Sequence, residues 1–180
     1  HQREIYGFMI HPRMGIPRSL PYLSDRFLDM VACAVAEAAR LQMAVMLYDE
    51  GMYPSGSAHG QVVAANPAYA AQALVRYTDD EILNISDSAR LIHTRSVRLP
   101  DGQSIRVAYV QEPSGGKIRG IHFGEDSGQP DAPPAADLLN PDATACFIRL
   151  THERYYHRLA PYFGTTIQAM FTDEPSLLGR

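Results

Sequence analysis

The sequence contains no tryptophan, a single lysine and only two cysteines among its 180 residues. Two cysteines are too few for the disulfide framework of a small secreted domain, so Cys33 and Cys146 are expected to be free, buried thiols. No apolar run approaches the roughly 18 residues that a membrane-spanning helix needs. A secretory signal pattern is also missing from the start of the sequence, and we therefore expect a cytoplasmic protein.

The charged residues are nearly balanced, with 16 basic and 20 acidic side chains and a formal net charge of −4. Nucleic-acid binding depends on clustered lysine and arginine side chains. Here Lys117 is the only lysine and the arginines are scattered along the sequence. We therefore expect neither nucleic acid nor a membrane as a partner. The hydrophobic content of 46% is sufficient for one sizeable core.

The hydrophobic pattern predicts strands that alternate with helices. Three apolar runs are typical of buried strands, at residues 5–10, 43–48 and 167–171. Three helices are predicted between or beside them, at residues 24–42, 66–77 and 140–163. This order of elements favours βαβ units on a parallel sheet.

The alternation breaks between residues 78 and 134, where shorter runs alternate apolar and polar side chains. Three of these runs are expected to be antiparallel strands, at residues 90–98, 104–111 and 118–123. Asp101-Gly102 lies between the first two and is a signal for a hairpin turn. We therefore divide the chain into βα units at residues 1–77, a β-rich insertion at residues 78–134 and a further βα unit at residues 135–180.

Two of the predicted strands end in a pair of acidic residues. Asp49 and Glu50 follow the second strand, and Asp173 and Glu174 follow the last one. Loops at the carboxyl ends of parallel strands form a ligand-binding face, so carboxylates there suit general acid, base or nucleophile roles in glycoside hydrolysis. Acids at strand ends also cap helices or lie in solvent, and the repetition at two equivalent positions leaves both interpretations open.

Four segments together resemble the catalytic barrel of large bacterial glycoside hydrolases, in particular the α-L-rhamnosidase-like family 106 and its relatives. They are residues 7–13, 47–56, 137–141 and 171–176. The resemblance implies an α/β fold, namely a partial TIM (β/α) barrel with a small antiparallel β insertion, and a carbohydrate as partner. Because a complete barrel needs about 250 residues, we expect this chain to be either the N-terminal half-barrel of a longer enzyme or a natural truncated relative.

The resemblance and the acidic strand ends together define the expected site. Glu174 and Glu50 are the expected catalytic residues. Substrate binding is expected of six further residues: His11, Tyr48, Asp49, Tyr53, Asp137 and Asp173. No cofactor is predicted from the residues themselves, and calcium enters only through the resemblance, without assigned ligands.

Two further expectations concern assembly and activity. An isolated half-barrel exposes sheet edges and apolar helix faces, so we expect self-association. We also expect the 180-residue chain alone to be a poor catalyst, because one carboxylate of the pair would lie on a strand outside it. The alternative hypothesis is a non-catalytic carbohydrate-binding or assembly module that retains the half-barrel.

Overall fold

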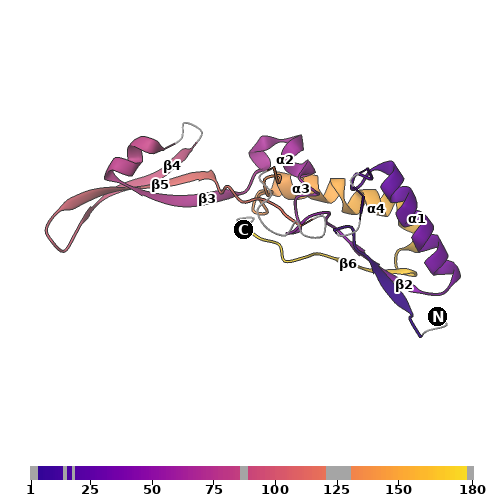
Figure 1. Ribbon diagram of the computed structural model, residues 1–180. Helices are drawn as coiled ribbons and strands as arrows, with labels where there is room; N and C mark the ends of the chain where they lie inside the picture. The colour runs from indigo at the N-terminus through magenta and orange to yellow at the C-terminus, as the bar shows by residue number, and fades with distance from the viewer. Residues whose placement is uncertain (1–3, 14–15, 18, 86–88, 121–130, 178–180) are drawn as a thin grey trace.

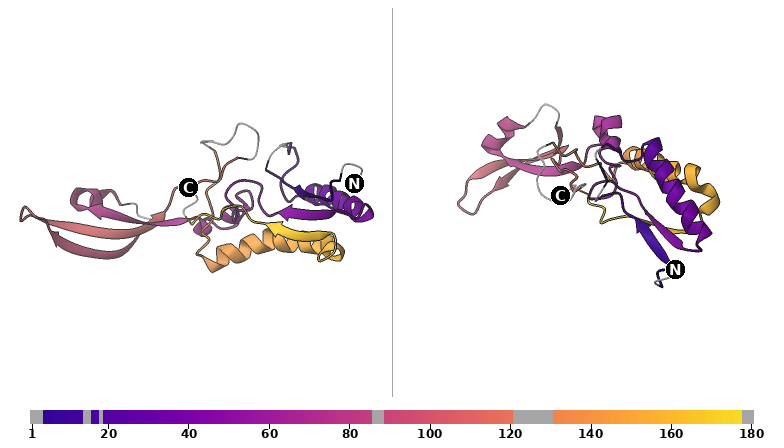
Figure 2. Two further views of the ribbon diagram at one scale, coloured as in Figure 1. Left: turned by 90° about the horizontal axis from the view of Figure 1, so that it is seen from below. Right: turned by 45° about the vertical axis from the view of Figure 1, so that its right-hand side comes forward.

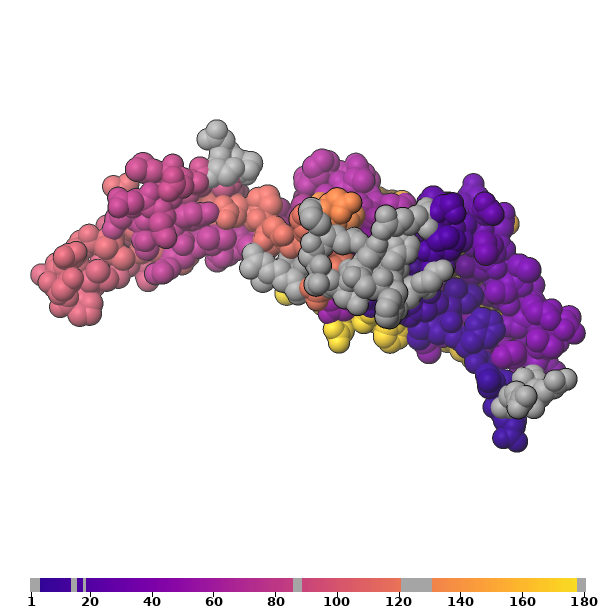
Figure 3. Space-filling view, in the orientation of Figure 1, coloured from indigo at the N-terminus to yellow at the C-terminus, as the bar shows by residue number. Residues whose placement is uncertain are grey.

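The computed structural model describes residues 4–13, 16–17, 19–85, 89–120 and 131–177, to which all structural statements refer. The described chain has two parts (Figure 1). We call the parallel sheet with its helices the body, and residues 72–113, which form an antiparallel sheet, the arm. The arm extends away from the body in each view of Figure 2, which gives the molecule an elongated shape (Figure 3).

The sheet of the body consists of three parallel strands in the order β1-β2-β6. They are β1 (Gly7–Ile10), β2 (Ala44–Tyr48) and β6 (Ile167–Phe171), which confirms the three predicted apolar strands. β2 is the central strand, and its side chains alternate between the two faces of the sheet. Val45 and Leu47 are buried on the face that the helices cover.

Helices α1 (Asp25–Arg40), α3 (Pro141–Leu150) and α4 (His152–Leu159) lie along one side of this sheet (Figure 1). Ser24 begins α1 as predicted, because its Oγ accepts a hydrogen bond from the N–H of Phe27. The inward side chains of these helices form a single core with the strands: Phe27, Val31, Val35, Val45, Leu47, Phe147, Tyr155, Leu159 and Ile167. None of the described helices is both long and apolar enough to cross a bilayer.

Two of the predicted helices differ from the structure. The predicted helix at residues 140–163 is divided into α3 and α4 at Thr151, whose hydroxyl donates to the carbonyl of Phe147. The predicted helix at residues 66–77 is wrong. Only η1 (Pro67–Tyr69) is helical there, and β3 (Gln72–Thr78) follows, because Val75 and Tyr77 pair with β5 of the arm. A short helix, α2 (Gln61–Ala65), lies in the preceding segment, which was not expected to be helical.

The arm is a three-stranded antiparallel sheet in the order β3-β5-β4. η2 (Asp79–Asn84) follows β3, and a hairpin joins β4 (Arg90–Arg98) to β5 (Ser104–Pro113). The turn predicted at Asp101-Gly102 is confirmed, since the N–H of Gly102 bonds to the carbonyl of Leu99 and Gly102 has a φ of +87°. The antiparallel sheet begins at residue 72 rather than 78.

Two smaller expectations are corrected by the structure. The run at residues 118–123 was expected to be a strand, but residues 117 and 119 make single β-bridges only, and residues 121–123 lie outside the described part. Cys146 is buried as expected, whereas Cys33 is exposed on α1.

The expected partial TIM barrel is wrong. A barrel requires one closed parallel sheet whose strands follow each other in sequence, each with its helix. The described chain instead has two separate sheets of three strands, one parallel and one antiparallel. β6 pairs directly with β2, and the strands that lie between them in the sequence form the arm rather than further parallel strands. The fold is therefore a mixed α/β structure with few helices.

Candidate functional site

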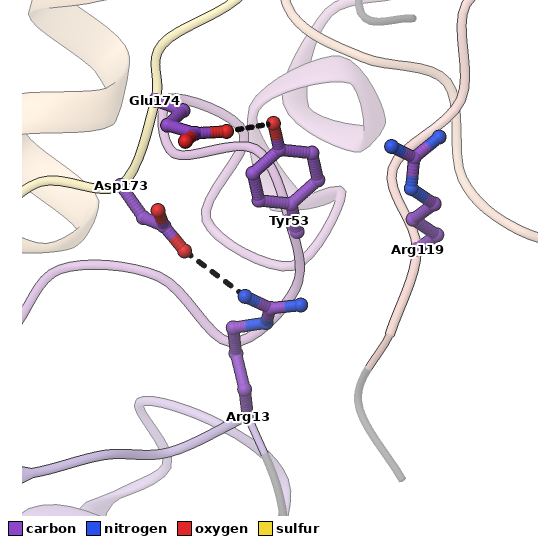
Figure 4. A pocket seen from close by; sticks show the side chains of 5 residues that line it. All are labelled: Arg13, Tyr53, Arg119, Asp173 and Glu174. Carbon is purple, nitrogen blue, oxygen red and sulfur yellow. Dashed lines mark hydrogen bonds and ion pairs between the residues drawn. The ribbon is translucent and has the colours of Figure 1, made fainter. Parts of the chain in front are cut away.

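The carboxyl ends of the parallel strands open onto a cleft of about 470 Å³ (Figure 4). Five residues line it: Arg13, Tyr53, Arg119, Asp173 and Glu174. Arg13 follows β1, and Tyr53 follows β2. The acidic pair follows β6, whereas Arg119 comes from the segment after the arm. In open α/β sheets, ligands bind outside the carboxyl ends of the strands, which is where this cleft lies.

Asp173 is held in a fixed orientation by its neighbours. Its Oδ2 accepts a hydrogen bond from the Arg13 guanidinium at 2.9 Å and a second from the Tyr48 hydroxyl. Its backbone N–H donates to the Oγ of Ser55 at 2.9 Å. Burial, together with the hydrogen bond to Asp173, raises the pKa of Tyr48. Tyr48 therefore remains a hydrogen-bond donor to this carboxylate at neutral pH.

Glu174 is exposed to solvent at the rim of the cleft. Its Oε2 accepts a hydrogen bond from the Tyr53 hydroxyl at 2.6 Å, and this contact is the main cause of a raised pKa of Tyr53. Glu174 has a φ of +38°, in the left-handed region that residues other than glycine rarely adopt. Such strained positions cluster at ligand sites. The backbone thus adopts an unfavourable conformation at the residue that presents the carboxylate.

Tyr53 is the aromatic centre of the cleft. The guanidinium carbons of Arg13 and Arg119 lie 5.2 Å and 5.1 Å from its ring centroid, within the range of cation–π contacts. Two backbone hydrogen bonds of 2.7 Å and 2.8 Å join Tyr53 to Arg119 and position the second arginine. Figure 4 shows the Tyr53 ring between the acidic pair and Arg119.

Glu50 lies beneath the cleft and does not reach it. Its carboxylate is fully buried and accepts hydrogen bonds of 2.6–3.2 Å from five backbone N–H groups, those of Gly51, Met52, Ser57, Ala58 and His59. Ala58 and His59 have positive φ, a conformation that turns successive N–H groups toward an anion. Burial raises the pKa of Glu50 to about 7, against the opposing effect of these donors.

These contacts give Glu50 a structural role in the loop that carries Tyr53 and Ser55. The sequence-based prediction made Glu50 a catalytic residue together with Glu174. Both oxygens of Glu50 are occupied by backbone donors and no part of the side chain is exposed. We therefore retain Glu174 alone as the candidate catalytic acid.

Asp49 is also fully buried, and it connects three elements of the body. Its Oδ1 accepts from the Ser55 hydroxyl at 2.7 Å, and its Oδ2 accepts from the Thr172 hydroxyl at 2.7 Å. Nε2 of His152 on α4 lies 3.3 Å from the same Oδ2. Asp49 thus ties the end of β2 to the end of β6 and to the helix layer. It supports the cleft from below rather than lining it.

The remaining predicted residues are His11 and Asp137. His11 packs edge-on against Tyr48, with ring centroids 4.5 Å apart, beside the cleft. Partial burial and the nearby Arg13 lower the pKa of His11, so its ring is neutral at pH 7. Asp137 lies apart from the cleft. Its Oδ1 accepts from the N–H of Leu139 and forms the turn that leads into α3.

The structure therefore brings most of the predicted residues into one region. Tyr53, Asp173 and Glu174 line the cleft, while Tyr48 and His11 flank it. Sequence reasoning missed Arg13 and Arg119. The position of Arg13 could have been predicted, because it follows the first predicted strand just as each acidic pair follows a predicted strand. The position of Arg119 could not, because only the contact between Tyr53 and the segment after the arm places it there.

Within the described residues, no group of three or more histidine, cysteine, aspartate or glutamate side chains is arranged to hold a metal ion. The resemblance is therefore the only support for bound calcium, and calcium has no role in the chemistry proposed below.

Comparisons with protein-family models, with curated proteins and with solved structures find no match to this chain. The resemblance of the four sequence segments to rhamnosidase-like glycoside hydrolases therefore has no support from these comparisons.

Proposed function

We propose that the cleft binds a carbohydrate and hydrolyses a glycosidic bond, with Glu174 as the general acid. One observation carries this proposal. An exposed carboxyl group, oriented by the Tyr53 hydroxyl at 2.6 Å, stands next to a second carboxylate that Arg13 and Tyr48 hold in place, at the carboxyl ends of parallel strands. Glycoside hydrolysis uses two carboxyl groups that flank the scissile bond.

The two acids have different surroundings, which supports different roles. Tyr53 occupies Oε2 of Glu174, and Oε1 makes no hydrogen bond to any described residue, so it is free to protonate the leaving-group oxygen. Asp173 is fixed by its donors and cannot rotate freely. In this proposal Asp173 stabilises the positive charge that develops on the sugar ring in the transition state. Because both acids line the cleft of this chain, the proposal replaces the expectation that one carboxylate lies outside it and that the chain alone is a poor catalyst.

Sugar binding in the proposed site relies on tyrosine and arginine, since the sequence lacks tryptophan. The Tyr53 ring presents an apolar face and a hydroxyl group, a combination that suits the alternating C–H and O–H groups of a sugar. The two guanidinium groups beside it supply hydrogen-bond donors for sugar hydroxyls.

The test is Glu174→Gln, assayed on a panel of aryl glycosides with Glu153→Gln on α4 as the control variant. We expect the cleft variant to lose about a hundredfold or more in turnover of substrates with poor leaving groups, in line with the contribution of general acid catalysis. Dinitrophenyl glycosides should be affected less, because their leaving groups need little protonation. Sugar affinity, measured by product inhibition, should be retained.

Two results would count against this assignment. Turnover of a poor leaving group within about threefold of wild type in the Glu174→Gln variant would remove Glu174 as the acid. Glycan binding by the wild-type chain without turnover of any aryl glycoside would favour a non-catalytic carbohydrate-binding module instead. The contacts of Tyr53 with two arginines are compatible with that second candidate as well, because sugar binding by these groups would need no catalytic acid.

A further inference from the structure

The register of the arm places its basic residues unevenly on the two faces of the sheet. Arg76 of β3 and His93 of β4 lie opposite Tyr109 of β5, one on each side. Since side chains alternate along a strand, the rows two residues away share this face. One of these rows ends in Arg90 and the other in Arg95. We call this surface the Tyr109 face, formed by Leu74, Arg76, Thr78, Arg90, His93, Arg95, Val107, Tyr109 and Gln111.

No acidic strand residue lies on the Tyr109 face. Glu112 belongs to the opposite face, where it accepts hydrogen bonds from the Tyr77 hydroxyl. Glu81 of η2 lies at the edge of this face, because the N–H and the hydroxyl of Thr78 donate to its carboxylate and its charge interacts with that of Arg76. Among the described residues the face therefore carries three arginines against the one carboxylate of Glu81, and its net charge is positive.

The basic side chains of the Tyr109 face are available for binding. Arg76, Arg90, His93 and Arg95 are all exposed. None of them forms an ion pair with another described residue. The arm extends away from the body, so the body does not cover this face (Figure 2), although η2 contacts β3 and β5 and Val107 is buried.

We propose that the Tyr109 face binds an acidic polysaccharide, through its carboxylate or sulfate groups. A guanidinium group binds such oxyanions with two parallel hydrogen bonds. Rows two residues apart along a strand are separated by about 6.8 Å. Arg90 and Arg95 lie along β4 and Arg76 lies across β5 on β3, so the three arginines can contact different charges of one extended ligand. Tyr109 and His93 lie between them and contact the sugar rings.

Tyr109 and His93 form the aromatic part of this face. The His93 ring stacks on Tyr109 with centroids 6.4 Å apart and an interplanar angle of 22°, so the two rings together offer one aromatic surface to a sugar ring. The choice of a carbohydrate rests on the proposed function, but the residues of this face are separate from the cleft.

The experiment compares two double variants that each remove two positive charges from the same sheet. Arg76→Gln with Arg95→Gln changes the Tyr109 face, and Arg98→Gln with Arg106→Gln changes the opposite face. Binding of a polygalacturonate oligosaccharide is measured by calorimetry at low salt, with its fully methyl-esterified form as the uncharged probe. We expect the first variant to bind the charged probe roughly tenfold or more weakly and the second to stay within about twofold of wild type. The esterified probe should not bind measurably.

Three results would overturn the proposal. Equal loss in both double variants would show a general effect of net charge, and unchanged binding in both would exclude this face. A single-stranded oligonucleotide that binds more tightly than polygalacturonate, and loses affinity with Arg76→Gln and Arg95→Gln, would make nucleic acid the partner. The Glu174→Gln variant should bind polygalacturonate as wild type does, so failure of the cleft assignment and failure of this proposal remain distinguishable.

Discussion

The body and the arm bury their apolar residues in different ways. The body covers one side of a parallel sheet with three helices and forms a continuous core from the strands and helices together. The arm has only its central strand well buried, at Val107, Ala108 and Val110. Small antiparallel sheets with few buried side chains open more readily than a helix-covered core. The strand ends that carry the cleft therefore stand on the more rigid part of the molecule.

The cleft nevertheless depends on the junction between the two parts. A small separate core at this junction consists of Met52, Ala71, Ile118 and Ala135. Next to it, the backbone bridge between Tyr53 and Arg119 joins the loop after β2 to the segment after the arm. Arg119 thus reaches the cleft only while this junction is intact. A change in the body is expected to affect the whole site, and a change in the arm is expected to affect Arg119 first.

The largest expected effect is that of Glu50→Gln in the body. The amide nitrogen of glutamine cannot accept a hydrogen bond, so at least two of the five backbone N–H groups that bind Glu50 would lose their acceptor. Leaving buried donors unpaired costs about 1–3 kcal/mol each, and we expect the free energy of unfolding to fall by about 3 kcal/mol or more. Urea denaturation followed by circular dichroism measures this loss.

The matched control for this change is Glu37→Gln on α1, where the carboxylate is exposed and pairs with Arg40. Solvent screens such pairs, and the urea midpoint of the control should stay close to that of wild type. A Glu50→Gln variant as stable as the control would mean that the buried carboxylate does not organise its loop.

A smaller effect is expected of alanine substitutions that compare the core of the body with the core of the arm. Val35 on α1 and Val110 on β5 are both fully buried, and alanine at either position removes the same atoms. We expect Val35→Ala to lower the global free energy of unfolding by about 2 kcal/mol. Val110→Ala should instead increase hydrogen exchange in the arm while amides of β2 and β6 keep their protection. Hydrogen-exchange mass spectrometry of both variants tests this, and equal loss of protection in both parts would show one cooperative unit.

The body could be predicted from the sequence where its local signals are strong. The apolar runs of β2 and β6 and the Ser24 cap of α1 are visible in the sequence and are confirmed. β3 could not be recognised, because Pro67 signals a helix start and the strand forms only through pairing with β5. A barrel was expected from the resemblance of the four segments, and nothing local in the sequence shows that β6 pairs directly with β2.

The candidate site shows the same division between local and distant information. Asp173 and Glu174 could be predicted as cleft residues because the strand before them is clear in the sequence. Glu50 has the same local pattern, as the second acid after a strand, and only the wrapping of its own loop buries it. Arg119 lies in a segment with no catalytic motif. Its place depends on a contact with Tyr53 that joins distant parts of the chain.

The smallest effect concerns the open face of the body, which is expected to associate weakly with a second copy. Met9, Met46 and Ala169 form one row on the side of the parallel sheet away from Val45 and Leu47. Met9 is 38% exposed, although parallel sheets are usually covered on both faces. β1 and β6 are also edge strands, each with one unpaired side in the described sheet.

We therefore expect wild-type chain to show concentration-dependent association in sedimentation velocity, and Met9→Gln to weaken it by at least about fivefold, the effect of losing about 1 kcal/mol of apolar burial. Leu91→Gln is the control in the arm, because Leu91 is more exposed than Met9 and lies outside the parallel sheet. If the arm does not take part, this control leaves the association constant unchanged. If both substitutions lower the association constant equally, the arm also takes part in the contact. The body and the arm would then not differ in their contribution to self-association.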